Sequence, residues 1–145
     1  MREILFRGQT RKYGEKVNIN GEKLPGKWVY GGILQGAGDF SVIYGYDSVD
    51  EHAIVNLEKH VVHTDTVGQY TGLTDKNGVR IFEGDILKYT NEDGELHYLT
   101  VVFEDCAFLI DDDGIVDADL LTSYVCLGLE VAGNVHDDPQ LLKGV

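Results

Sequence analysis

The chain has 145 residues, of which 43% are hydrophobic, and it carries a formal net charge of −13 at pH 7. That much apolar material can build one or two compact units whose core needs no disulfide or metal. The apolar runs are too short to cross a membrane, and the first residues, MREILFRGQTRKYG, lack the apolar centre of a secretory signal. We therefore expect a cytoplasmic protein with no membrane segment, in which Cys106 and Cys126 are reduced and lie in the core.

Short apolar alternations predict a mainly β protein, because sustained helical spacing is almost absent and eighteen glycines mark frequent turns. Phe40, Val42, Tyr44 and Tyr46 alternate and would share one face of a strand. In chain order, strands are expected at residues 4–6, 27–34, 40–46, 53–57, 60–63, 79–82, 85–89, 98–103 and 125–131. Two short helices are expected, at residues 117–124 and 138–143, the second with Asp138 as its cap and Pro139 in its first turn.

The segment TVGQYTGLTDKNGVRIFEGDILK, residues 66–88, carries the clearest turn signals. Asn77-Gly78 predicts a hairpin with a type I′ turn, in which both central residues have positive φ. Gly84-Asp85 is expected to redirect one strand into the next, and Asp93-Gly94 to close a second hairpin. Such residues are the usual components of turns, so we expect them to serve the backbone.

The charge is unevenly divided along the chain. Residues 1–70 hold eight basic and nine acidic residues, a net charge of −1, whereas residues 71–145 hold four and sixteen, a net charge of −12. Within the first part, residues 1–27 hold seven basic and three acidic residues, a net charge of +4. We expect a β-rich part over residues 1–70 and a subdomain over residues 71–145, or one compact unit, with attraction between basic and acidic surfaces.

Several phrases follow one another along the chain: MREILFRG at the start, GKWVYG at 26–31, TVGQYTGL at 66–73, DKNG at 75–78, IFEGDI at 81–86, EVAGNVH at 130–136 and PQLL at 139–142. In wording and order they resemble the YopX-like family of bacteriophage and prophage proteins. The resemblance implies a phage or prophage gene product in a bacterial host, with an irregular β-rich N-terminal part followed by a small SH3-like β-barrel. It implies no established activity.

No combination of residue types predicts catalysis. The sequence has no GxSxG elbow, no glycine-rich phosphate loop with lysine and no CxxC pair. His52, His60, His63 and Asp65 are of metal-ligand type, but His60 and His63 would point to opposite faces of one strand. The run Asp111-Asp112-Asp113-Gly114 lacks the alternating ligands of a calcium loop and is expected to be a solvated turn. We expect no enzyme, no cofactor and no metal site.

Protein association is the function that we expect, either as a homo-oligomer or with a host or phage protein. Strand aromatics suit such an interface, although burial in a core is their commoner use, and the candidates are Trp28, Tyr30, Tyr44 and Tyr46. One alternative is nucleic-acid binding, which the overall charge opposes, through a patch of Arg2, Arg7, Arg11, Lys12 and Lys16. Another alternative is an acidic surface that mimics DNA and inhibits a host protein.

Overall fold

The computed structural model describes residues 1–10, 26–36, 38–49, 55–121 and 128–143, with residues 46–49, 55–57 and 117–120 described by their backbone alone. The chain forms two compact units, called the first unit (Glu3–Gln69) and the second unit (Tyr70–Val145). The division lies beside the change in net charge at residue 70. In the described ranges, no helix is both long and apolar enough to span a membrane.

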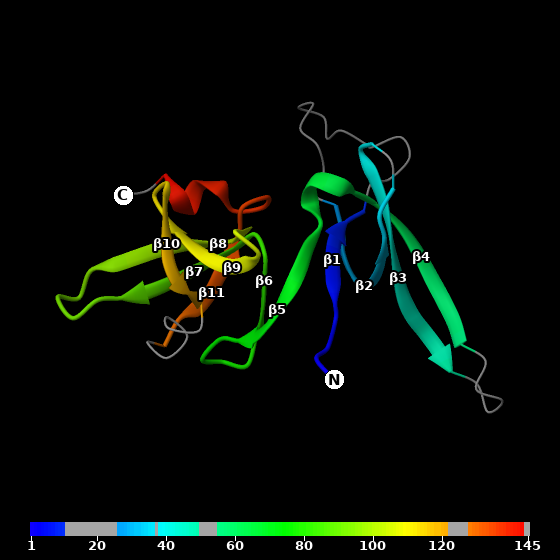
Figure 1. The fold of residues 1–145 in the computed structure, drawn as a ribbon, viewed down its shortest axis with the longest axis horizontal. Coiled ribbons are helices and arrows are strands. Elements are labelled where there is room, and N and C mark those ends of the chain that lie inside the picture. Colours follow the sequence, from blue (N-terminus) through cyan, green and yellow to red (C-terminus); the bar gives the residue numbers. More distant parts are fainter. Residues whose placement is uncertain (11–25, 37, 50–54, 122–127, 144–145) are drawn as a thin grey trace, which may run out of the picture. The chain divides into compact units, whose positions relative to one another are not determined.

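The first unit is an antiparallel meander of strands (Figure 1). Its elements pair in chain order: β1 (Phe6–Gln9) with β2 (Trp28–Leu34), β2 with β3 (Phe40–Val49), and β3 with β4 (Val55–His63). A short 3-10 turn, η1 (Thr64–Thr66), leads into β5 (Gly68–Thr74), whose first residues pair with β1. A bridge between Thr10 and Val62 brings the chain after β1 to β4, so the sheet curls around its own inner face.

Alternation along these strands separates an inner face from an outer face. Val29, Ile43 and Val62 are buried and form the core on the inner face, where Phe6, Ile33 and Val67 pack against them. Gly31 lies in the same alternating series, and a Cβ atom there would overlap the carbonyl oxygen of Tyr44. The close approach of β2 and β3 therefore depends on this glycine.

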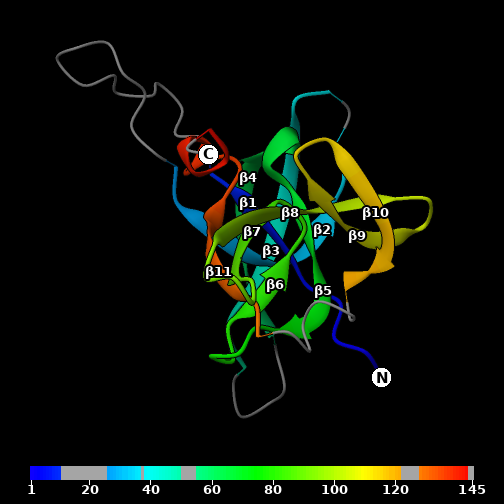
Figure 2. The ribbon, with the colours of Figure 1, turned by 90° about the vertical axis from the view of Figure 1, so that its left-hand side faces the viewer.

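The second unit is built on a five-stranded antiparallel sheet with the order β10-β9-β8-β7-β11 (Figures 1 and 2). Its strands are β7 (Asp85–Thr90), β8 (Leu96–Glu104), β9 (Ala107–Asp112), β10 (Ile115–Leu120) and β11 (Glu130–Asn134). β6 (Arg80–Phe82) pairs with β5, and the 3-10 turn η2 (Pro139–Leu142) follows β11.

Cross-strand pairs of branched residues fill the core of the second unit. Leu87 lies opposite Leu99, and Val101 lies opposite Ile110. All four side chains are buried, and Ile81, Leu121 and Leu129 complete the cluster. This sheet has open edges at β10 and β11, so the mainly β prediction is confirmed while the SH3-like barrel is not.

The hairpin at Asn77-Gly78 is confirmed, but its predicted type I′ turn is wrong. Among the described residues other than glycine, only Asp105, Cys106 and Asp113 have a positive φ. Asn77 therefore lacks the positive φ that a type I′ turn requires at its first central residue. Gly78 has a φ of 79°, and its N–H donates to the carbonyl of Asp75. A five-residue loop with glycine in its fourth position therefore replaces the two-residue turn. Asn91 to Glu95 form the same loop, with Gly94 in the fourth position.

Several other expectations need correction. Residues 53–57 and 60–63 were expected as separate strands, whereas β4 is continuous from residue 55 to 63. Residues 117–120 form the end of β10 and not the start of a helix, because pairing with β9 outweighs the capping signal of Asp117. Asp138 precedes η2 but forms no side-chain cap. Cys106 is free but exposed at a turn, and Cys126 lies outside the described residues.

Candidate interaction surfaces

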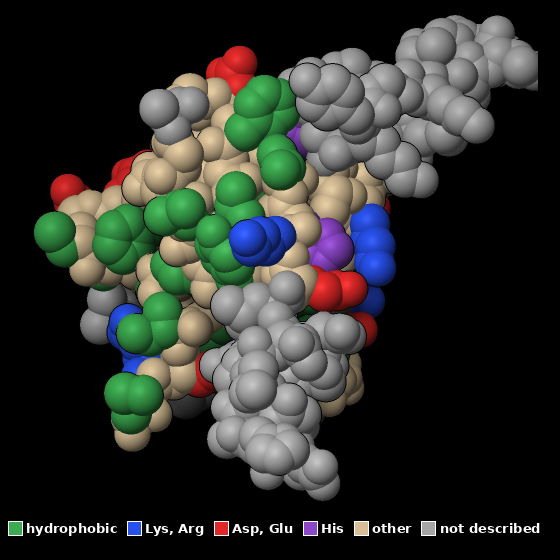
Figure 3. All heavy atoms as spheres, turned by 90° about the vertical axis from the view of Figure 1, so that its right-hand side faces the viewer, with side chains coloured by type: hydrophobic (Ala, Val, Ile, Leu, Met, Phe, Trp, Pro, Cys, Tyr) green, Lys and Arg blue, Asp and Glu red, His purple; other side chains and the backbone are tan. Residues whose placement is uncertain are grey.

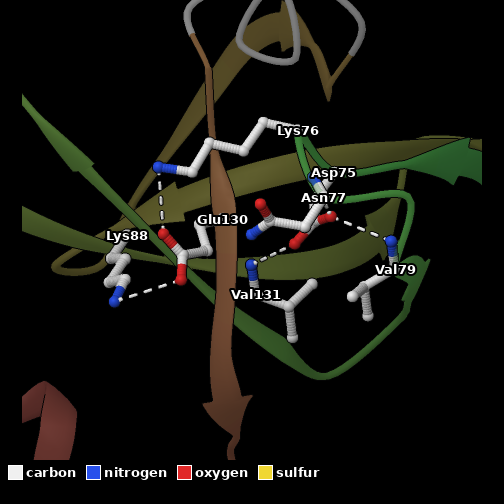
Figure 4. Close-up of polar contacts among 7 residues, drawn as sticks. All are labelled: Asp75, Lys76, Asn77, Val79, Lys88, Glu130 and Val131. Carbon is white, nitrogen blue, oxygen red and sulfur yellow. Dashed lines mark hydrogen bonds and ion pairs between the residues drawn. The ribbon is translucent and has the colours of Figure 1, made fainter.

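The DKNG phrase, residues 75–78, is an anchor for the second unit. Oδ1 of Asp75 accepts hydrogen bonds from the backbone N–H groups of Asn77 (2.8 Å) and Val79 (2.9 Å), and Oδ2 accepts one from Val131 (3.0 Å). Figure 4 shows the carboxylate reaching from the hairpin to β11. Asp75 therefore ties a local turn to a strand that lies more than fifty residues later in the chain.

Two opposing effects act on the pKa of the Asp75 carboxyl. Burial raises this pKa. The three backbone hydrogen bonds and the nearby Lys76 together lower it by more than burial raises it, so the pKa lies below its ordinary value. Beside it, Glu130 accepts from Lys76 (3.0 Å) and Lys88 (3.4 Å), and the hydrogen bond from Lys76 is the main cause of its lowered pKa (Figure 4). Both carboxylates are charged acceptors with structural partners.

The neighbouring motifs, at residues 81–86 and 130–136, also have structural roles. The Asp85 carboxylate is buried and accepts the N–H of Phe82 at 2.7 Å, which holds the bend at Gly84 between β6 and β7. Oδ1 of Asn134 accepts the N–H groups of His136 and Asp137, both at 3.0 Å, and so shapes the turn after β11. These segments therefore stabilise turns.

The outer face of the first unit carries a band of apolar side chains across β2, β3 and β4. Leu34 lies opposite Val42 in the β2–β3 ladder, and Val42 lies opposite Val61 in the β3–β4 ladder. Leu34 and Val61 are 57% and 52% exposed, and Tyr30 and Phe40 are also exposed. Figure 3 shows hydrophobic side chains gathered on the side of the molecule where β3 and β4 lie.

This outer face holds most of the predicted interface residues. Trp28 and Tyr44 are half-buried, and Tyr30 is exposed. Tyr46 lies opposite Leu57 in the register, but its side chain is outside the described residues. Sequence reasoning missed Leu34 and Val61. The adjacent valines at 61 and 62 were the available signal, because consecutive strand residues point to opposite faces.

The predicted basic patch can be placed only in part. The guanidinium of Arg7 lies 4.7 Å from the centre of the Trp28 ring, and Arg7 is 7% exposed. Arg2 is exposed and groups with the second unit. Arg11, Lys12 and Lys16 lie outside the described residues. Arg7 therefore has a packing role against Trp28 and offers little surface to a phosphate.

A groove of about 370 Å³ lies in the second unit where β8 and β9 separate, and we call it the fork groove. The β8–β9 ladder ends at the pair Thr100 and Asp111, beyond which β8 continues with β7 and β9 turns into β10. Figure 1 shows the β7–β8 hairpin extending beyond the rest of the sheet. The lining residues are Leu96, His97, Tyr98, Thr100, Asp111, Asp112, Asp113, Gly114 and Leu142.

The walls of the fork groove combine acidic, aromatic and apolar groups. Asp113 and Gly114 both have positive φ, so the β9–β10 connection is a tight two-residue turn, and Oδ1 of Asp111 accepts the N–H of Gly114 at 2.8 Å. His97 stacks on Tyr89, with ring centres 5.2 Å apart. Because sequence reasoning treated the aspartate run as a solvated turn, it did not connect this run with β8.

The histidines do not gather into a metal site within the described residues, where no group of three or more His, Cys, Asp or Glu is arranged to hold an ion. His60 Nε2 lies 3.1 Å from Oε2 of Glu58, whereas the ring of His63 lies 6.0 Å from that of Phe40. His52 lies outside the described residues.

Comparisons with known proteins agree on the family and the fold. The family model described as YopX protein matches residues 27–143. A crystal structure of protein EF1440 from Enterococcus faecalis aligns over 98% of this chain and 99% of that chain, with 21% identity and a TM-score of 0.55. At this identity the likeness shows a shared fold. No curated protein matches the sequence.

Proposed function

Since the chain belongs to the YopX family, we propose that it is a phage or prophage accessory protein of the bacterial cytoplasm that acts through protein association and not through catalysis. The phage context comes from the family resemblance. The mode of action rests on one observation, which is the apolar band on the outer face of the first unit.

That band has the apolar and aromatic composition of an interface centre, with the exposed Lys59 beside it on the same face of β4. A protein with a net charge of −13 keeps Leu34 on β2 and Val61 on β4, the two strands that flank β3, more than half exposed, together with Tyr30 and Phe40. Interface centres are depleted in charge and enriched in aromatic residues. A partner that covers the band would remove these side chains from water, and the burial would stabilise the complex by about 25 cal/mol for each Å² of apolar surface.

The partner that we propose first is a second copy of the chain. The two parts of the chain differ in net charge by eleven units, and residues 1–27 are positively charged. Self-association can therefore combine the apolar band with attraction between basic and acidic surfaces of neighbouring copies, and the electrostatic part should weaken as salt rises.

Sedimentation velocity of the full chain at low and high salt tests the proposal. We expect an oligomer in the micromolar range, and we expect Leu34→Gln combined with Val61→Thr to shift it to monomer without changing the circular dichroism. Val79→Thr is the matched control, because Val79 is 48% exposed but lies in the second unit. A wild-type chain that stays monomeric at all concentrations and both salts would argue against self-association.

A second measurement addresses association with another protein. The tagged chain and its Leu34→Gln, Val61→Thr form would be purified from the native lysogen, with and without nuclease, and the co-purifying proteins identified by mass spectrometry. Association through the outer face predicts a partner that the double variant loses. A partner that both forms retain would place the interface elsewhere, and nuclease-sensitive recovery would favour the nucleic-acid alternative.

A further inference from the structure

The fork groove is a second surface with its own chemistry. It exists because β8 pairs with different strands along its length. Residues 100–104 of β8 pair with β9, and residues 96–100 of β8 pair with β7. The β9–β10 turn forms one side of the opening, and Leu142 of η2 contributes to the lining. A hollow of about 370 Å³ lies within the size range of ligand pockets, about 300–1,000 Å³.

One side of this groove is lined by the three carboxylates of Asp111, Asp112 and Asp113. Among the described residues, no lysine or arginine forms an ion pair with Asp111, Asp112 or Asp113. Lys76 and Lys88 instead bind Glu130. The groove therefore presents to a ligand carboxylates that have no ion-pair partner among the described residues.

The rest of the lining combines apolar and aromatic side chains with the polar Thr100 and with Gly114. Leu96 and Leu142 are 47% and 41% exposed, and Tyr98 is half-buried. Lysine and arginine side chains match both features, because their aliphatic stems cover apolar surface while their cationic ends pair with carboxylates or lie on aromatic rings. A metal ion would use the carboxylates alone, and nucleic acid would be repelled by them.

From these features we propose that the fork groove binds an extended, lysine- or arginine-bearing segment of a partner protein. The stem of the basic side chain packs between Leu96, Tyr98 and Leu142, and its charged end meets Asp111 and Asp113. This binding uses the second unit alone and does not require the outer face of the first unit, so the two surfaces can be tested separately.

The test is a fluorescence-polarisation titration of the full chain with a labelled decapeptide of alternating arginine and glycine at about 150 mM salt. The variant is Asp111→Asn with Asp113→Asn. Asparagine tolerates the φ of 51° at Asp113, and at position 111 it keeps an oxygen for the N–H of Gly114. The matched control is Glu104→Gln with Asp105→Asn at the β8–β9 turn, which removes the same charge outside the groove lining.

We expect the groove variant to raise the dissociation constant about tenfold and the control variant less than about twofold, since exposed ion pairs contribute modestly and the control removes only distant charge. A decapeptide with glutamine in place of arginine should bind at least tenfold more weakly. Leu142→Ser should weaken binding about threefold, which a purely electrostatic attraction would not produce.

Backbone amide shifts map the site independently. Titration with the arginine peptide should move the amides of Tyr98 and Gly114 at sub-stoichiometric peptide, ahead of other residues. Equal weakening by the two double variants, or shifts spread evenly over the acidic surface, would overturn the proposal and show attraction to the overall charge. Specific binding by a chain that remains monomeric would support the fork groove while refuting self-association.

Discussion

Replacing Asp75 with asparagine should destabilise the second unit by about 2–3 kcal/mol. Asp75 is 6% exposed, and its two oxygens accept three backbone N–H groups. Asparagine can keep the bonds to Asn77 and Val79, but its NH₂ group then faces the N–H of Val131, where two donors meet. A hydrogen bond to a charged group contributes about 1.5–3 kcal/mol, and an unpaired buried N–H costs about 1–3 kcal/mol.

Alanine at position 75 removes all three hydrogen bonds, and the expected loss is about 4 kcal/mol or more. Asn91 offers a matched comparison, because it has the same place in the second five-residue loop, where its Oδ1 accepts the N–H of Glu95 on an exposed hairpin. Asn91→Ala should cost no more than about 1 kcal/mol, since water can replace the lost acceptor. The difference between the two positions contains the long-range bond to Val131 together with the effects of charge and burial at Asp75.

The effect should also depend on pH. The pKa of Asp75 in the folded protein lies below the ordinary value of 3.8, so its charged form stabilises the fold above that value, and this contribution is lost as the pH falls through the folded-state pKa. The stability difference between wild type and Asp75→Asn should therefore be constant near pH 7 and shrink below about pH 4.

Native-state hydrogen exchange is the appropriate assay, because two compact units need not unfold together. Protection should fall at Val79, Val131 and the core amide of Leu99. The fluorescence of Trp28, the single tryptophan, reports on the first unit. Protection at Val131 within about 0.5 kcal/mol of wild type in Asp75→Asn would refute the reasoning, because the error of additive estimates is of that size.

Three further substitutions and one control test individual contacts, with urea unfolding as the measurement. Gly31→Ala should destabilise the first unit by at least about 2 kcal/mol because its Cβ atom would overlap the backbone of Tyr44, whereas Gly32→Ala, with open space around it, should change stability by under about 1 kcal/mol. Arg7→Met should cost about 1–2 kcal/mol and shift the emission of Trp28, on which the guanidinium lies, and unchanged emission would contradict that contact. Asp85→Ala should cost about 2–4 kcal/mol by leaving the buried N–H of Phe82 without its acceptor, and a loss below about 0.5 kcal/mol would show that water replaces it.

Elements whose conformation is determined by local sequence were predicted correctly, whereas elements determined by contacts with other parts of the chain were not. Strands with clear alternation, such as β3 and β8, were predicted because alternation is a property of the segment itself. The helix expected at 117–124 was wrong over residues 117–120, where the ladder with β9 decides the conformation. The turn at Asn77 was wrong in type because Asp75 uses its side chain to shape a longer loop.

The surfaces were predictable to a smaller extent. Tyr30 and Tyr44 were expected at an interface, and both lie on the outer face, but exposure depends on which strands surround them. The fork groove joins residues 96–98, 100, 111–114 and 142, and no spacing in the sequence links these segments. Only the pairing of β8 with both β7 and β9 brings them together.

The two five-residue loops also bear on the order in which the second unit folds. Oδ1 of Asp75 meets its partners within four residues, whereas Oδ2 must wait for Val131, which is brought to it by the pairing of β11 with β7. Local contacts form quickly, whereas distant contacts form slowly because the chain between the two residues must first lose the entropy of closing a loop. In Asp75→Asn, the hairpin should consequently form at its normal rate, and the lost bond should show as faster unfolding. The two oxygens of one carboxylate thus act at different stages of folding: Oδ1 stabilises the early local turn, and Oδ2 stabilises the sheet once β11 has paired.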